Sequence, residues 1–194
     1  MAKLTGKKKI FCAVFISGRG TNLKSLYKYS QKKTSLINLK LVISNKSNVA
    51  GVKFARKNKI KTKVINYKNK QKAEKKILEI LNENQIKLIC LAGFMKILSK
   101  NFLKKFKNKI INIHPSLLPK YKGLNTHERV IKNREKFSGC TVHFVSEKLD
   151  SGKIIIQERI KILKKDDPKS LAKKILRIEN KIYPRALQKI IPNF

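Results

Sequence analysis

Asn112 and His114 stand two residues apart at the end of a β-branched apolar run, directly before Pro115. Residues two apart in a strand point to the same face, so this spacing places an amide beside an imidazole. Pro115 cannot donate a ladder hydrogen bond and is expected to end the strand there. Because ligands of open α/β sheets bind at the carboxyl ends of the strands, the pair is a candidate catalytic site. The alternative is a buried strand with one hydrogen-bonded Asn and one satisfied His.

A glycine-rich turn, Ser-Gly-Arg-Gly-Thr-Asn, follows an apolar run at 10–16 and precedes apolar residues at helical spacing. A strand, turn and helix of this kind aim backbone N–H groups and the positive end of the helix dipole at an anion. Leu23 replaces the third glycine of the dinucleotide fingerprint, and no Gly-Lys-Ser/Thr of a Walker A loop follows. The turn predicts a site for a phosphate monoester, held by backbone amides with Asn22 or Arg19. A plain tight turn is the alternative.

The elements that must position these residues alternate between strands and helices. Apolar patterns predict strands at 10–16, 39–44, 62–65, 88–92, 110–114 and 139–145. Helical spacing predicts helices after the glycine-rich turn and at 49–58, 71–83, 99–106 and 126–131, with Ser99 and Thr126 as N-caps. This alternation predicts an α/β fold with a single-domain, mostly parallel twisted sheet and helices on both faces.

The last part of the chain departs from this alternation. Segments 154–156 and 160–163 predict late strands antiparallel to the rest. A C-terminal helix is expected to begin with Asp167 as N-cap and Pro168 as first residue. Glu179 lies off its apolar stripe, and Pro184 is expected to kink or end the helix. We expect the whole chain, 1–194, to form one domain.

The formal net charge is +37, from 48 Lys and Arg against 11 Asp and Glu. Nucleic-acid binding would explain this charge if the cations gathered in one stripe with aromatic residues between them. The lysines are instead spread over almost every surface segment, and there is no Trp. Compositional drift is therefore favoured over a specific nucleic-acid partner, although anionic substrates should still be attracted.

Three cysteines, Cys12, Cys90 and Cys140, lie in apolar strand contexts without metal-ligand spacing. They predict reduced, buried thiols, no metal and a cytoplasmic protein. No apolar run is long enough to span a membrane, so no membrane partner is expected. The basic N-terminus around Lys3 and Lys7 is followed by no small-residue cleavage site, so no signal peptide is expected.

Longer motifs surround these candidates. They are Ile-Ser-Gly-Arg-Gly-Thr-Asn-Leu at 16–23, Ser-Asn-Lys at 44–46, Leu-Ala-Gly-Phe-Met-Lys-Ile-Leu at 91–98, Asn-Ile-His-Pro-Ser-Leu-Leu-Pro-Lys-Tyr at 112–121, Gly-Leu-Asn-Thr-His at 123–127, Val-His-Phe-Val at 142–145, Leu-Asp-Ser-Gly at 149–152 and Ile-Tyr-Pro at 182–184. In these motifs the chain resembles, nearly end to end, the phosphoribosylglycinamide formyltransferases, folate-dependent enzymes of purine synthesis. The Asn-x-His-Pro-Ser-Leu-Leu-Pro segment marks the whole formyltransferase superfamily, and Gly-Leu-x-Thr-His points to the glycinamide branch. The resemblance implies a Rossmann-like formyltransferase fold.

The resemblance also implies a role for each motif. Phosphoribosylglycinamide would be held by the glycine-rich turn and a late acid: Gly18, Arg19, Gly20, Thr21, Asn22 and Glu179. The co-substrate 10-formyltetrahydrofolate would be bound by two loops: Met95, Lys96, Ile97 and Leu98, and Ser146, Glu147, Lys148, Leu149 and Asp150. Asn112, His114 and Asp150 would be the catalytic trio, with Asn112 also contacting the folate. Lys70 is the nearest counterpart of an Arg with which relatives contact the folate.

In the implied reaction a primary amine attacks the formyl carbon, and negative charge develops on the formyl oxygen. The Asn112 N–H and protonated His114 can donate to that oxygen. Histidine as a residue type ordinarily changes charge near neutral pH, so His114 can help move a proton from the amine to N10 of the folate. An Asp beside the imidazole favours its charged form. Because the amine is the nucleophile, neither Cys140, Ser116 nor a metal is needed.

Lys122, Asn125 and Ser151 stand where relatives usually have Pro, His and Gly, which predicts a looser loop and reduced stability. A formyltransferase acting on aminoacyl-tRNA or an amino sugar, and a folate deformylase, are the nearest alternatives. The tRNA enzyme would be expected to carry a further C-terminal domain and the deformylase an extra N-terminal one. A basic nucleic-acid-binding protein would leave the trio without a use, and a decayed enzyme is disfavoured because the trio is complete. The sequence leaves monomer and homodimer open.

Overall fold

The computed structural model describes residues 9–193, and the basic residues 1–8, on which the expectation about a signal peptide depends, lie outside them. The strands are β1 (Ile10–Ile16), β2 (Ile37–Ser44), β3 (Lys61–Val64), β4 (Leu88–Leu91), β5 (Lys109–His114), β6 (Phe137–Phe144) and β7 (Ile154–Lys161). The helices are α1 (Thr21–Ser30), α2 (Ala50–Lys57), α3 (Lys70–Glu83), α4 (Lys100–Lys105), α5 (Thr126–Lys132) and α6 (Pro168–Ile190), followed by a short 3-10 turn at Ile191–Asn193.

Within the described residues, the strands form one seven-stranded sheet in the order β3-β2-β1-β4-β5-β6-β7. Neighbours from β3 to β5 pair in parallel, whereas β6 is antiparallel to both β5 and β7. The predicted α/β sheet, mostly parallel with late antiparallel strands, is confirmed. Two details differ: segment 154–156 and residues 160–161 belong to the single strand β7, which ends before residues 162–163. The chain reverses at β6, so β7 runs in the same direction as β5.

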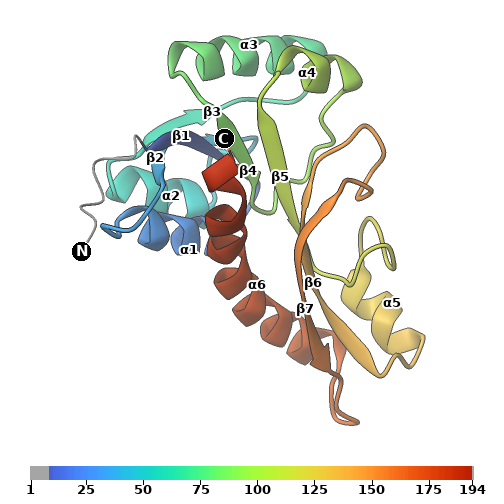
Figure 1. Ribbon diagram of the computed structural model, residues 1–194. Helices are drawn as coiled ribbons and strands as arrows, with labels where there is room; N and C mark the ends of the chain where they lie inside the picture. Colours follow the sequence, from blue (N-terminus) through green and yellow to red (C-terminus); the bar gives the residue numbers. More distant parts are fainter. Residues whose placement is uncertain (1–8, 194) are drawn as a thin grey trace.

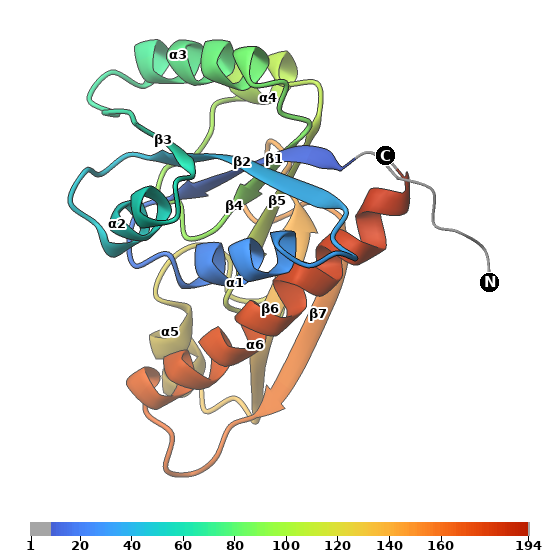
Figure 2. The same ribbon diagram turned by 90° about the vertical axis from the view of Figure 1, so that its left-hand side faces the viewer.

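Helices cover both faces of the sheet (Figures 1 and 2). Helices α1, α2, α5 and α6 bury apolar side chains on one face, and α3 and α4 do so on the other. The interior strand β1 contributes to both layers, with Val14 on the first side and Phe15 on the second. This double burial explains why its sequence is almost continuously apolar.

Side chains cap several helices, as their sequences predict. Ser99 accepts a hydrogen bond from the Phe102 N–H at the start of α4, and Asp167 does the same for Ser170 in α6. The predicted N-cap Thr126 is wrong, because the capping position of α5 is Asn125 and Thr126 is the first helical residue. Asn125 has φ 55°, a left-handed conformation that Asn tolerates better than most residues.

Of the two outcomes expected at Pro184, the end of the helix is wrong, because α6 continues to Ile190, and the kink stays a prediction. Proline has no N–H and therefore leaves the carbonyl of Asn180, four residues earlier, without its helical donor. The hydroxyl of Ser25 on the neighbouring helix α1 donates to that carbonyl. A tertiary hydrogen bond thus replaces the one that the proline removes.

This replacement predicts that Ser25 and Pro184 are energetically coupled. Ser25→Ala should destabilise the protein by about 1 kcal/mol, because the Asn180 carbonyl loses its donor. In a Pro184→Ala background the helix supplies a backbone donor again, so the same substitution should have almost no effect. Urea unfolding of the two single variants, the double variant and the wild type measures the coupling. An equal loss in both backgrounds would show that Ser25 does not compensate for the proline.

Candidate active site

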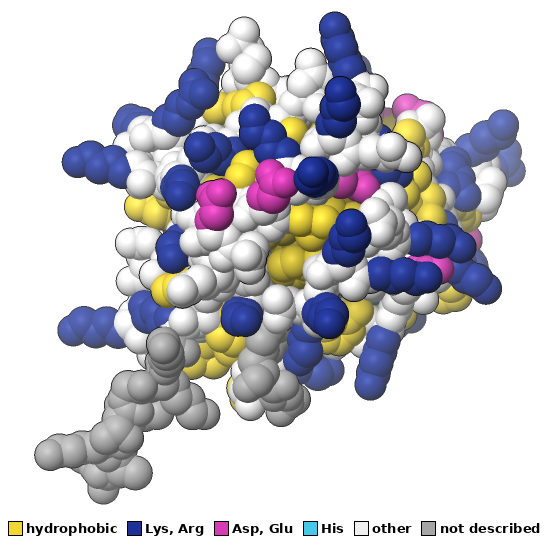
Figure 3. All heavy atoms as spheres, turned by 90° about the horizontal axis from the view of Figure 1, so that it is seen from above, with side chains coloured by type: hydrophobic (Ala, Val, Ile, Leu, Met, Phe, Trp, Pro, Cys, Tyr) yellow, Lys and Arg dark blue, Asp and Glu magenta, His cyan; other side chains and the backbone are white. Residues whose placement is uncertain are grey.

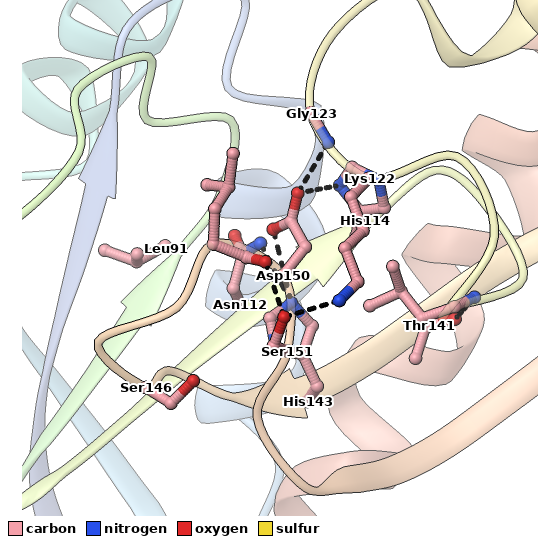
Figure 4. A network of polar contacts seen from close by, with 12 residues as sticks. Leu91, Asn112, His114, Lys122, Gly123, Thr141, His143, Ser146, Asp150 and Ser151 are labelled. Carbon is pink, nitrogen blue, oxygen red and sulfur yellow. Dashed lines mark hydrogen bonds and ion pairs between the residues drawn. The ribbon is translucent and has the colours of Figure 1, made fainter.

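The polar cluster lies at the carboxyl end of β5, beside the facing part of β6 (Figure 4). The strand ends at His114, as the following proline predicts. Asn112 pairs across the strands with His143, and His114 pairs with Thr141. Asp150 reaches the same place from the loop between β6 and β7. The sheet and one loop therefore bring together Asn112, His114 and Asp150, as the sequence predicts, and add His143.

The carboxylate of Asp150 is the centre of this cluster. Its Oδ2 accepts a 2.9 Å hydrogen bond from the Gly123 N–H and lies 3.4 Å from Nδ1 of His114. Its Oδ1 lies 3.7 Å from Nε2 of His143. The Asp150 side chain is only 8% exposed, and its backbone has φ 46°, in the left-handed region. The carboxylate therefore holds together the loop that precedes α5 and the loop that follows β6.

Both ring nitrogens of His114 face oxygen atoms. Nε2 lies 2.9 Å from the carbonyl oxygen of Tyr121, which can only accept a hydrogen bond. Nδ1 faces the Asp150 carboxylate on the other side. The doubly protonated imidazolium therefore finds an acceptor at each nitrogen, and the ring is fixed in orientation at 6% exposure.

His143 takes the opposite role, that of a neutral acceptor. Its Nδ1 lies 2.8 Å from the Phe144 carbonyl oxygen and must carry the hydrogen. Burial lowers the pKa of His143, outweighing the Phe144 carbonyl and Asp150, which raise it, and His114 lowers it further. The lone pair on Nε2 then accepts from Nδ2 of Asn112 at 3.3 Å. One N–H of the half-buried Asn112 amide is thus occupied, and the other can donate to a ligand.

Lys122 and Ser151 join the two loops at the edge of the cluster. Nζ of Lys122 donates to Oγ of Ser151 at 2.6 Å, and that hydroxyl donates to the Leu149 carbonyl at 2.8 Å (Figure 4). These two residues depart from the family pattern, and the structure places them in contact with each other. The predicted looseness of this loop is not tested by these contacts and stays a prediction.

The glycine-rich turn connects β1 to α1 and presents free helix-end amides. Gly20 has φ 70° and occupies the N-cap of α1, where no side chain accepts from the first N–H groups. A Cβ on Gly20 would lie 2.7 Å from the Cα of Gly51 on α2, so only glycine fits this close approach. Thr21 begins the helix, and the side chain of Arg19 is exposed. The turn has the geometry that helix N-termini use to bind phosphate.

Glu179 is buried at 8% exposure although it lies off the apolar stripe of α6. Its Oε2 accepts a 2.8 Å hydrogen bond from Nδ2 of Asn22, which joins it to the glycine-rich turn. Burial raises the pKa of the Glu179 carboxyl, and the Asn22 hydrogen bond opposes this rise. In the described part of the chain Glu179 has no ion pair, and Oδ1 of Asn22 is buried without a hydrogen bond. This pair is incompletely satisfied beside a potential phosphate site.

The predicted folate loop follows β4 and is divided between surface and core. Met95 and Ile97 are 61% and 64% exposed, and Lys96 is exposed as well. Leu98 is 7% exposed and packs in the core, so its side chain offers a ligand little surface. Its predicted contact with the folate stays a prediction.

The second predicted folate loop lies between β6 and β7. The side chains of Ser146, Glu147 and Lys148 are exposed there, and Leu149 is 50% exposed. An ion pair of 3.4 Å joins Glu147 to Lys100, which links this loop to α4. Lys70 is exposed at the start of α3, and within residues 9–193 it forms no hydrogen bond or ion pair with either loop.

Sequence reasoning missed His143 and His127 as site residues. One signal in the sequence could have found both: the chain has three histidines, and the other one is the catalytic candidate His114. His127 lies in the first turn of α5, and its Nδ1 is buried without a hydrogen bond. Burial lowers the pKa of His127, and the nearby His114 lowers it further. The histidines therefore form one electrostatic group.

The buried carboxyl of Glu179 predicts a pH-dependent stability. Because the pKa is raised, the folded protein binds this proton more tightly than the unfolded chain, and stability falls as pH rises from the ordinary value of 4.5 through the raised one. Glu179→Gln removes that loss, and its amide can donate to Oδ1 of Asn22. We expect the melting temperature of the variant to exceed that of wild type by about 2–4 °C at pH 8, with a smaller difference at pH 4.5.

Glu83→Gln, at the end of α3, is the matched control for removing a carboxylate and should show no such pH-dependent gain. A Glu179→Gln variant that is less stable than wild type at pH 8 would contradict the assignment of a buried, unpaired acid.

Within residues 9–193, no three or more His, Cys, Asp or Glu residues gather in an arrangement that could hold a metal ion. No helix in these residues is long and apolar enough to cross a membrane.

Comparison with known proteins places this geometry in a family. The formyl transferase family profile matches residues 9–187. The phosphoribosylglycinamide formyltransferase of Haemophilus influenzae is 39% identical over 184 residues, which cover 93% of this chain and 86% of that protein. The trifunctional purine biosynthetic protein adenosine-3 of Homo sapiens is 44% identical over 185 residues, 94% of this chain. The chain spans only 18% of the length of that relative.

Solved structures agree with this placement. The crystal structure of phosphoribosylglycinamide formyltransferase from Anaplasma phagocytophilum is 40% identical, with a TM-score of 0.90 over 96% of this chain and 88% of that one. The corresponding enzyme from Brucella melitensis is 37% identical, with a TM-score of 0.90 over 95% of this chain and 96% of that one. Sequence and structure together show that the chain belongs to the formyl transferase family, within its phosphoribosylglycinamide formyltransferase branch.

Proposed function

We propose that this protein transfers the formyl group of 10-formyltetrahydrofolate to the amine of 5-phosphoribosylglycinamide, a step of purine synthesis. The observation that carries the proposal is the cluster of Asn112, His114 and Asp150 in a chain that aligns with glycinamide formyltransferases over nearly its whole length. The amine nitrogen forms a bond to the formyl carbon, the bond from that carbon to N10 breaks, and a proton passes from the amine to N10. Tetrahydrofolate leaves as the second product.

The polar cluster supplies what the tetrahedral intermediate needs. The unoccupied N–H of Asn112 donates to the developing oxyanion, while His143 holds the amide in position. The imidazolium of His114 stabilises the same oxyanion through its charge. Direct donation from its Nε2 would require that nitrogen to leave the Tyr121 carbonyl. Asp150 balances the charge of His114 and orients its ring, as the third member of a catalytic group does.

The phosphoribosyl substrate would bind at the start of α1. Backbone amides of residues 18–22 receive the phosphate, with Arg19 free to reach it from the surface. Glu179 and Asn22 then accept from polar N–H and O–H groups of the same substrate. Such contacts would satisfy Oδ1 of Asn22 and place a hydrogen-bond donor against the buried carboxylate. The retention of an unpaired acid at this place is consistent with a binding role.

The folate would lie between the two loops that follow β4 and β6. Exposed side chains of Met95 and Ile97 offer an apolar surface to a flat ring, and Leu149 offers another from the opposite loop. Backbone groups of residues 95–98 bond the ring edge, while Ser146, Glu147 and Lys148 close the pocket. Lys70 is retained as a proposed contact for the charged end of the folate.

The remaining expectations extend the proposal. Residues 1–194 are proposed to form a single formyltransferase domain that acts in the cytoplasm. The buried cysteines Cys12, Cys90 and Cys140 form no disulfide, which fits a reducing compartment.

We propose small molecules, rather than nucleic acid, as the partners of the charged surface. Figure 3 shows Lys and Arg side chains around the whole outline of one face instead of in a single stripe.

A surface cavity between α1 and α6 is consistent with that choice. Its volume is about 620 Å³, and it lies between α1 and α6, lined by Lys24, Lys28 and Lys32 among others. The aromatic ring at this cavity, Tyr29, is 3% exposed and offers no free face on which a base could stack.

Direct measurement of formyl transfer tests the proposal. Wild type should convert phosphoribosylglycinamide in the presence of 10-formyltetrahydrofolate, and His114→Ala should lower the rate by at least about a hundredfold, because the oxyanion loses its cation. Lys120→Met, in the loop that follows His114, is the matched control, since its exposed ammonium pairs with Glu135 beyond α5. That variant should retain the wild-type rate. A folded wild type that shows no turnover when saturated with both substrates would refute the function.

A further inference from the structure

We propose that Ser17 is a positioning residue that couples the two substrate sites energetically. It joins the glycine-rich turn, the proposed phosphate site, to the loop after β4, the proposed folate site. The inference rests on the proposed function, because it assigns a thermodynamic property to those two sites. It adds that the binding of either substrate strengthens the binding of the other.

Three hydrogen bonds connect Ser17 to two other loops. Its backbone N–H donates to the Gly93 carbonyl at 3.1 Å, and its Oγ accepts from the Met95 N–H at 2.8 Å. The same hydroxyl donates to Oδ1 of Asn45 at 2.6 Å. Loops that follow β1, β2 and β4 thus meet at one side chain, which is 5% exposed.

The hydroxyl is fixed by these contacts. A serine hydroxyl has one hydrogen to donate, and Asn45 receives it, so a lone pair is left for Met95. The backbone from residue 93 to residue 95 is therefore held at both ends by Ser17. Met95 itself projects its side chain into solvent at 61% exposure, so its position depends on this backbone anchor.

The other side of Ser17 leads directly into the phosphate turn. The next residue, Gly18, accepts at its carbonyl from the Gly51 N–H of α2 at 3.1 Å. A phosphate bound to the amides of this turn fixes residues 18–22 and, through them, the backbone of Ser17. A loop that is already anchored loses less conformational entropy when its own ligand binds. Linkage requires the effect to be reciprocal, with the same factor in both directions.

Equilibrium binding of a non-reacting ligand pair tests this coupling in the whole protein. Phosphoribosylglycinamide and tetrahydrofolate, which has no formyl group to transfer, are titrated separately and then together. In wild type each ligand should lower the Kd of the other by the same factor, about fivefold or more. In Ser17→Ala this factor should fall towards one, and tetrahydrofolate alone should bind about fivefold to tenfold more weakly because the Met95 N–H loses its acceptor.

Matched variants separate positioning from general stability. Ser17→Thr keeps the hydroxyl and should keep the coupling. Asn45→Ala removes the acceptor at a half-exposed position and should weaken the coupling, which provides a second test if Ser17→Ala does not fold. Ser35→Ala is the control, because it removes an equally buried hydroxyl that also bonds one backbone donor and one acceptor, both on Ile37. Its coupling factor should equal that of wild type.

The outcomes distinguish this inference from the proposed function. If both ligands bind wild type independently, or if Ser17→Ala weakens both ligands equally and keeps the coupling factor, the inference is overturned while the function stands. If a folded wild type binds neither ligand, the proposed function fails, and the inference fails with it.

Discussion

The contact between the Asp150 carboxylate and the ring of His114 is the interaction on which the site depends. A carboxylate at 8% exposure costs free energy unless charge and hydrogen bonds compensate for its lost hydration. His114 supplies the charge, and the Gly123 N–H supplies a hydrogen bond. To reach both groups, Asp150 adopts a left-handed backbone that a non-glycine residue seldom takes. The contacts of Asp150 with His114 and Gly123 therefore hold the loop between β6 and β7 in a strained conformation.

The neighbouring groups divide into charged and neutral roles. Both ring nitrogens of His114 face acceptor oxygens. In His143, by contrast, Nδ1 donates to a carbonyl oxygen and Nε2 accepts from the Asn112 amide. In the proposed mechanism, the neutral ring of His143 holds the Asn112 amide, and the charged ring of His114 stabilises the oxyanion. Environments that separate the roles of similar titratable groups are a common basis of acid–base chemistry. Under the proposed function, the buried Glu179, which has no ion pair within residues 9–193, is a second place where binding is favoured over stability.

Local patterns predicted much of this arrangement. The alternation around Asn112 and His114 and the glycines of the turn after β1 could be predicted, because each reflects backbone geometry within a few residues. Tertiary contacts decide the rest. His143 joins the site through the register of β5 against β6, which no local pattern encodes. Pro184 is tolerated because Ser25, far away in the sequence, donates to the freed carbonyl. Leu98 packs into the core. The sequence could not predict this direction, because a loop has no regular period of inward and outward side chains.

The most direct test of the central contact is the formyl-transfer rate of Asp150→Asn compared with wild type, both saturated with substrates at neutral pH. The amide keeps the volume of the side chain and can still accept from the Gly123 N–H, but it removes the negative charge beside His114. The account predicts a rate at least about a hundredfold lower in a protein that remains folded. A folded variant with a rate close to that of wild type would contradict the central role of this carboxylate.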